Sequence, residues 1–208
     1  MQKNKTEIVI VVDRSGSMGA IREDMEGGIK GFITEQQKLE GETRITYCQF
    51  DTEYELVFEN KIAADVKDIA IVPRGMTALV DAVGRSINEV GERLAKTDKK
   101  DRPEKVIFLV ITDGMENSSR ELSAEKVKEM VQHQEDEYNW EFVFLGSNID
   151  AVAVGATMGF QQKGSMTYDS NTVGVTNALN SVTCYASTTR SGMKASFSAE
   201  DRTAASKG

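Results

Sequence analysis

The sequence predicts an α/β fold in which a mainly parallel, doubly wound sheet carries helices on both faces. Two observations lead to this prediction. Short, continuous apolar runs, typical of strands buried on both faces, alternate with longer segments whose apolar residues recur every three to four positions, as in amphipathic helices. This alternation implies right-handed crossovers between parallel strands. The length of 208 residues suits one domain with an additional element or tail, because a domain averages about 150 residues.

Each element follows from its own pattern. The apolar runs predicted to be strands are 8–12, 45–50, 106–111 and 142–145, and the segments with helical periodicity are 25–39, 79–94 and 127–131. A further apolar run, 54–58, follows 45–50 after three residues. So short a connection suits an antiparallel hairpin, and we therefore expect a mixed sheet with one antiparallel edge strand.

The last part of the chain carries weaker signals. A short helix is expected over 150–158, with its N-terminal cap at Asn148 or Asp150. Another helix is expected over 172–186, although its many Thr, Ser, Val and Asn residues have low helix propensity. From Ser187 onward, small and polar residues dominate, which predicts a frayed or disordered tail.

The chain is acidic, with 25 basic and 33 acidic residues and a formal net charge of −8. Nucleic acid and anionic membranes are disfavoured as partners, because both attract basic surfaces. No apolar run approaches the roughly 18 residues of a membrane-spanning helix, and the first residues do not resemble a signal peptide, so we expect a cytoplasmic protein. Cys48 and Cys184 lack the spacing of a zinc site, and both are expected to be buried free thiols. The single histidine, His133, excludes a multi-histidine metal centre and is expected at the surface.

Three polar side chains follow the first predicted strand directly. Asp13 ends the strand, and the hydroxyls of Ser15 and Ser17 come two and four residues later, with Gly16 relaxing the turn between them. In open α/β sheets, ligands bind outside the carboxyl ends of the strands, so these oxygens are aimed into one crevice. Ligand sets made only of oxygen suit hard divalent cations such as Mg²⁺, Mn²⁺ and Ca²⁺.

Two later segments take equivalent positions. Asp113 ends the strand predicted over 106–111, and Gly114 allows the following turn. Thr77 lies just before a predicted helix, where its hydroxyl faces the same crevice. The set of two carboxylates and three hydroxyls leaves room for an incoming ligand, because Mg²⁺ takes six oxygens and usually keeps waters. The alternative is that these residues only cap helices and turns, as Ser, Thr and Asp commonly do.

The three motifs resemble, in order and spacing, the metal-ion-dependent adhesion site (MIDAS) of von Willebrand factor type A (VWA) domains: Asp13-x-Ser15-x-Ser17, Thr77, and Thr112-Asp113-Gly114. The resemblance covers about residues 5–160. It implies a Rossmann-like fold whose central sheet has six strands, one edge strand being antiparallel. It also implies that the two aspartates and three hydroxyl residues hold Mg²⁺, with Mn²⁺ or Ca²⁺ as alternatives. VWA domains mostly bind protein partners, and an Asp or Glu of the partner completes the metal shell.

The predicted domain organisation follows from this resemblance. We expect one VWA-like domain over 1–190, made of a core of about 5–160 and a C-terminal extension of 161–190, and then a flexible tail over 191–208. The sequence leaves open whether the extension completes the sheet, packs across it or covers the metal face.

Several residues near the three motifs are candidates for the surroundings of the predicted metal site. Asp81 lies four positions after Thr77, on the same helix face, and is expected either to orient Thr77 or a bound water, or simply to favour the helix N-terminus by its charge. Met76 and Met115 are hypothesised to form part of an apolar collar around the metal, against which a partner packs, the alternative being chance placement. Gly114 is expected either just outside the metal ligands or at the rim of the site. The resemblance also implies that Met18 is buried beneath the first helix. Glu116 and Asn117 either shape the rim of the site or belong to a solvated loop; these two follow the third motif directly.

Three functions compete. The first is a non-enzymatic module that binds a protein partner through Mg²⁺. The second is a Mg²⁺-dependent phosphoester hydrolase, although such enzymes place a second acid two residues after the first, where this chain has Ser15. The third is a regulatory subunit or adaptor of a separate AAA+ ATPase, a role that intracellular VWA proteins often have.

Overall fold

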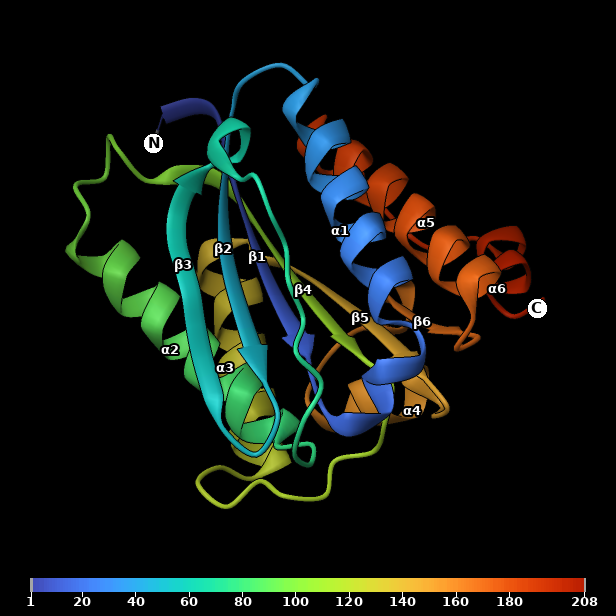
Figure 1. The fold of residues 1–208 in the computed structure, drawn as a ribbon. Helices are drawn as coiled ribbons and strands as arrows, with labels where there is room; N and C mark the ends of the chain where they lie inside the picture. Colours follow the sequence, from blue (N-terminus) through green and yellow to red (C-terminus); the bar gives the residue numbers. More distant parts are fainter. Residues whose placement is uncertain (1, 208) are drawn as a thin grey trace.

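The computed structural model describes residues 2–207 and contains a six-stranded sheet of order β3-β2-β1-β4-β5-β6 (Figure 1). The strands are β1 (Gln2–Asp13), β2 (Glu42–Phe50), β3 (Tyr54–Ile62), β4 (Pro103–Thr112), β5 (Glu141–Ser147) and β6 (Ser165–Tyr168). Neighbouring strands are parallel except β2 and β3, which form the antiparallel hairpin predicted from their short connection. The mixed, Rossmann-like sheet expected from the sequence is confirmed.

Helices cover both faces of the sheet (Figure 1). They are α1 (Arg22–Gln37), α2 (Leu79–Lys96), α3 (Ala124–Tyr138), α4 (Ala151–Thr157), α5 (Thr172–Arg190) and α6 (Ala199–Ala205). Buried side chains of α1, α5 and α6 belong to one apolar core, and those of α2, α3 and α4 to the other. The sheet is therefore a buried middle layer, as the continuous apolar runs predicted.

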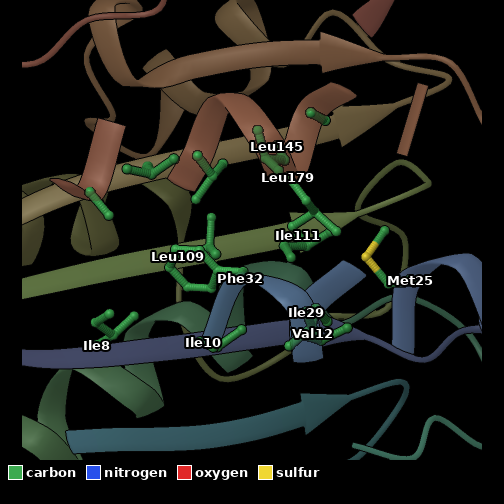
Figure 2. Packing of buried hydrophobic residues seen from close by; sticks show 14 of the residues in the cluster. Ile8, Ile10, Val12, Met25, Ile29, Phe32, Leu109, Ile111, Leu145 and Leu179 are labelled. Carbon is green, nitrogen blue, oxygen red and sulfur yellow. The ribbon is translucent and has the colours of Figure 1, made fainter. Parts of the chain in front are cut away.

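The side chains of β1 alternate between the two cores. Ile8, Ile10 and Val12 lie on the side of α1 and α5, in the core that also contains Phe32 and Leu179 (Figure 2). Val9 and Val11 belong to the opposite core, and all five β1 residues are fully buried. Burial of each such side chain contributes roughly 1.5–3 kcal/mol, so β1 is a rigid support for whatever follows it.

The C-terminal extension completes the sheet, which answers the question the sequence left open. Residues 165–168 form β6, parallel to β5, and α5 then crosses to pack against α1. The cap of α4 is Asp150, whose side chain accepts hydrogen bonds from the backbone N–H groups of Val152 and Ala153. Of the two caps considered, Asp150 is thus the correct one.

The flexible tail predicted over 191–208 is wrong for its main part. Residues 199–205 form α6, which starts with a capping box between Ser198 and Asp201. Phe197 is buried and its ring lies 5.0 Å from the ring of Tyr185, while Ala205 is fully buried. The prediction relied on a low count of large apolar residues, but hydrogen bonds also attach this short helix, among them the one that Ser181 Oγ donates to Asp201 Oδ1 at 2.9 Å.

Two smaller expectations have different outcomes. Cys48 is buried as predicted, whereas Cys184 is exposed, and neither forms a disulfide. His133 lies at the surface, as expected.

Among residues 2–207, no helix combines the length and apolar character needed to cross a membrane. The cytoplasmic location stays a prediction.

Candidate metal centre

The candidate site lies at the carboxyl ends of β1, β2 and β4, the lower end of the sheet in Figure 1. Three connections meet there, which we call the first loop (13–20), the second loop (73–78) and the third loop (113–119). The first and second loops touch directly, because the N–H of Gly16 donates to the carbonyl oxygen of Gly75 at 3.4 Å. This is the position at which open α/β sheets bind ligands.

Asp13 is the buried centre of the first loop. One carboxylate oxygen, Oδ1, accepts a hydrogen bond from the backbone N–H of Ser15 at 2.6 Å, and Oδ2 accepts one from the hydroxyl of Thr112 at 2.6 Å. Thr112 is itself held by Tyr168, whose hydroxyl donates to the Thr112 carbonyl oxygen at 3.2 Å. Thr112 belongs to the third motif, but the sequence assigned it no role; its place beside Asp113 was the signal that could have suggested one.

The hydroxyls of the first loop face the carboxylate of the third. Ser15 Oγ and Ser17 Oγ lie 3.1 Å apart, and Ser17 Oγ donates to Asp113 Oδ1 at 2.7 Å. The other oxygen, Asp113 Oδ2, is buried and has no hydrogen-bond partner among the described residues. A buried carboxylate oxygen without a partner is costly, so this atom marks a place for a proton donor or a cation.

Thr77 is fixed in the second loop by the third. Its N–H donates to Asn117 Oδ1 at 2.9 Å, and its carbonyl oxygen accepts from the N–H groups of Asn117 and Ser118. A Cβ atom placed on Gly114 would lie 3.8 Å from Thr77 Oγ1 and 3.9 Å from Ser17 Oγ. The hydroxyls of Thr77 and Ser17 therefore flank the same glycine, and the structure brings all five predicted ligands to one place.

The donor set fits a hard divalent cation. An octahedral ion with bonds of about 2.0–2.1 Å has adjacent ligand oxygens about 2.9 Å apart. The observed separations of 3.1 Å between Ser15 and Ser17 and 2.7 Å between Ser17 and Asp113 bracket that value. Within residues 2–207, no three His, Cys, Asp or Glu side chains gather into a metal-binding group, so the hydroxyls are essential to such a site.

Burial raises the pKa of both carboxyl groups. The pKa of Asp13 rises from 3.8 to about 6, because burial outweighs the hydrogen bonds from Thr112 and Ser15 that favour the charged form. Burial also raises the pKa of Asp113, against the hydrogen bond from Ser17. A divalent cation between the two groups would favour their ionised forms and lower both pKa values.

A charged cluster that the sequence did not reveal joins the first two loops. Asp51, the residue after β2, accepts hydrogen bonds at Oδ2 from Arg14 Nε and from Arg74 Nε, both at 2.8 Å. Arg14 also pairs with Glu55, and Arg74 pairs with Glu53 at 3.2 Å. Burial raises the pKa of Asp51, but Arg74, the N–H of Glu53 and Arg14 together hold it below its usual value.

The hydrogen bonds of the Asp81 carboxylate go to a different segment from Thr77, so its expected role in orienting the Thr77 side chain is not borne out. Its carboxylate accepts hydrogen bonds from the backbone N–H groups of residues 120–122, at 2.7–3.2 Å. It does lie in the first turn of α2, as the other expectation required. Asp81 therefore ties the segment after the third loop to α2.

Glu116 and Asn117 are structural parts of the third loop and not only a solvated rim. Glu116 accepts from the N–H groups of Ser118, Ser119 and Val80, at 2.7–2.9 Å. Asn117 holds Thr77, as described above. Both residues therefore join the third loop to the start of α2.

The methionines near the site differ in exposure. Met18 is fully buried, as expected. Met76 and Met115 are 51% and 67% exposed, one in the second loop and one in the third. Two large apolar side chains therefore stand in solvent on loops that carry proposed ligands.

Comparisons with known proteins bear on the fold. Neither a protein-family model nor a curated protein matches the sequence. The chain is similar in structure to proximal thread matrix protein 1 from the mussel byssus, described with a zinc-occupied MIDAS motif, at 18% identity and a TM-score of 0.62, over 88% of this chain and 46% of that one. It therefore spans less than half the length of that protein.

Two further solved structures are similar. The ArnB paralog VWA2 from Sulfolobus acidocaldarius has a TM-score of 0.54 and 16% identity, over 87% of this chain and 46% of that one. Manganese-loaded TRAP protein from Plasmodium vivax has a TM-score of 0.52 and 17% identity, over 82% of this chain and 71% of that one. At these identities the likeness concerns the fold.

Proposed function

Since this chain has the fold of a VWA domain, we propose that it is a non-enzymatic protein-binding module that depends on a divalent metal. The observation that carries the proposal is the cluster of buried oxygens in which Asp113 Oδ2 has no partner among the described residues. The residues that would hold the cation are Asp13, Ser15, Ser17, Thr77 and Asp113. Mg²⁺ is the proposed ion, with Mn²⁺ and Ca²⁺ as alternatives, because all five ligands are oxygens.

The cation supplies a positive charge with a coordination position open to a carboxylate. The two aspartates contribute a formal −2, which the ion's +2 cancels, so the site is locally neutral. A further Asp or Glu from a partner protein would bind there by filling the open coordination position of the cation. The exposed side chains of Met76 and Met115 are proposed to pack against apolar residues beside that carboxylate.

Metal binding is tested first by thermal unfolding with MgCl₂ or MnCl₂ against EDTA. A ligand present at 100 times its Kd stabilises the native state by about 2.7 kcal/mol, so the melting temperature is expected to rise. Asp113→Ala is expected to abolish the rise. Asp150→Asn, which changes an exposed carboxylate at the cap of α4, serves as the control and keeps it. No rise in the unaltered protein would reject the proposal.

The partner is tested by affinity capture from the native host in Mg²⁺ and in EDTA. Proteins retained only with Mg²⁺, and lost with Asp113→Ala, are the expected partners. A separate AAA+ ATPase is one partner class that this capture tests. Hydrolysis of a panel of phosphoesters with Mg²⁺ tests the enzymatic alternative, and turnover lost in Asp13→Asn would favour it over the binding module.

A further inference from the structure

We propose that Asp51 is a positioning residue for the metal centre: it holds the first and second loops in the arrangement that brings the hydroxyls of Ser15, Ser17 and Thr77 together. Asp51 is not among the proposed ligands and lies at the end of a different strand, β2. The inference rests on the proposed function, because it concerns how the same site is kept ready for its cation.

The contacts of Asp51 reach both loops. Its Oδ2 accepts from Arg14, which lies between two proposed ligands of the first loop, and from Arg74, which lies three residues before Thr77. Its backbone carbonyl oxygen accepts from the N–H of Ala78 at 2.9 Å, directly after Thr77. Asp51 therefore holds the chain before and after Thr77, the proposed ligand of the second loop, and also holds Arg14 inside the first loop.

The first and second loops also contact each other directly. The N–H of Arg74 donates to the carbonyl oxygen of Arg14 at 2.8 Å. Gly75 has a φ of +67°, and a Cβ on it would lie 2.9 Å from Thr52 Oγ1 and 3.2 Å from Asp51 Cβ. The second loop thus packs closely on Asp51, with glycine required by both conformation and space.

Burial makes the charge of Asp51 important. Asp51 is 2% exposed, and the side chain of Arg14 is 6% exposed. Without the carboxylate, the buried guanidinium of Arg14 would keep Glu55 as its one ionic partner among residues 2–207, and it would have to move toward solvent or draw the first loop with it. A movement of the first loop displaces the backbone between Asp13 and Ser15.

The test is the affinity for Mn²⁺, measured as free ion by electron paramagnetic resonance, for folded protein with Asp51→Asn. Asparagine keeps the size and loses the charge. Because groups that orient metal ligands typically contribute roughly 10–100-fold to metal affinity, we expect the Kd to rise at least tenfold. Arg74→Gln changes a half-exposed side chain of the same cluster and is expected to raise the Kd about threefold.

Glu7→Gln is the matched control. Glu7 is also a buried carboxylate of the sheet, accepts from Thr46 Oγ1 at 2.7 Å and pairs with Arg93. It lies on β1 six residues before Asp13, which corresponds to about 20 Å along the strand. Both Glu7→Gln and Asp51→Asn are expected to lower the urea midpoint in EDTA, but Glu7→Gln should leave the Kd for Mn²⁺ within twofold of the original.

The outcomes separate the two proposals. A native protein that does not bind Mn²⁺ rejects the proposed function. Binding by the native protein together with an unchanged Kd in Asp51→Asn overturns the role of Asp51 and leaves the function standing. If Asp51→Asn does not fold, Arg74→Gln decides, and an unchanged Kd in that variant overturns the role as well. An equal rise of the Kd in Glu7→Gln also overturns it, because the effect would then follow stability alone.

Discussion

At the scale of single residues, the site combines charge with burial. Asp13 and Asp113 are both almost inaccessible to solvent and lie in one cluster, where like charges and desolvation disfavour ionisation. Such groups weaken the fold in the absence of a cation and strengthen it when one binds. A cluster of this kind is expected where binding, and not stability, determines the residues.

The pH dependence of stability in EDTA is expected to reveal Asp13. Its pKa is about 6 in the folded protein and 3.8 as the ordinary value, so the native state binds this proton more tightly and loses stability as the pH rises through 6. The difference corresponds to about 3 kcal/mol. Asp13→Asn should therefore gain stability relative to the original protein between pH 4 and pH 7, measured by urea unfolding. A difference independent of pH would contradict the assignment.

The two thiols are expected to react differently. Burial raises the pKa of Cys48 to about 11, and Tyr54 and Ser86 surround its sulfur, whereas Cys184 is exposed. Titration of the native protein with a disulfide reagent should modify one thiol per chain rapidly, because the thiolate is the reactive form. Cys184→Ser should abolish this fast phase, and the second thiol should react only in urea. Two fast equivalents in native protein would show that Cys48 is accessible.

At the scale of elements, both edges of the sheet are protected against pairing with another chain. β3 is irregular in register with β2 at two places and carries Asn60 at a φ of 49°. β6 is covered by α6, because the N–H of Asp169 donates to the carbonyl oxygen of Ala205 at 2.9 Å and Arg202 donates to the carbonyl oxygen of Ser165. Bulges and covered edges are common means of preventing aggregation.

Attachment of α6 predicts the effect of changing Phe197. Phe197→Ala removes a buried ring that packs on Tyr185, and we expect a loss of about 3 kcal/mol in the free energy of unfolding, measured with urea. Met193→Ala, four residues earlier at a position that is 63% exposed, is the control and should change stability by less than about 0.5 kcal/mol. Equal effects of the two substitutions would contradict the packing of this segment.

At the scale of the whole molecule, the fold separates support from binding. The two apolar cores hold a rigid sheet, and the three loops at one end of it carry the polar residues of the site. The chain carries an overall charge of −8, to which the two proposed ligand carboxylates, Asp13 and Asp113, contribute. We infer that the remaining acidity serves solubility.

From the proposed function we predict that partner affinity and metal affinity can be changed separately. The double variant Met76→Gln and Met115→Gln is expected to weaken a partner identified by Mg²⁺-dependent capture about tenfold, equivalent to about 1.4 kcal/mol, since it removes exposed apolar surface and no ligand. The Kd for Mn²⁺ should not change. Met193→Gln is the control for an exposed methionine elsewhere on the chain. Unchanged partner affinity in the double variant would lead us to abandon the collar.

The sequence by itself determined the parts of this protein that depend on neighbouring residues. Apolar periodicity predicted the buried strands and the main helices, and the short connection predicted the antiparallel hairpin. The ligand motifs were visible because each follows the end of a strand, and parallel strands bring such ends to one edge of a sheet.

The tertiary structure alone decided the roles that depend on distant partners. Asp51 is separated from Arg14 by 37 positions and from Arg74 by 23, and no local pattern marks these contacts. Asp81 has a regular helical position, yet its carboxylate is bound by a loop 39–41 residues later. The last helix packs although its residues are small and polar, because Phe197, just before it, packs against Tyr185 of α5. Local patterns report periodicity and capping, whereas burial and charge pairing depend on which distant segments the fold brings together.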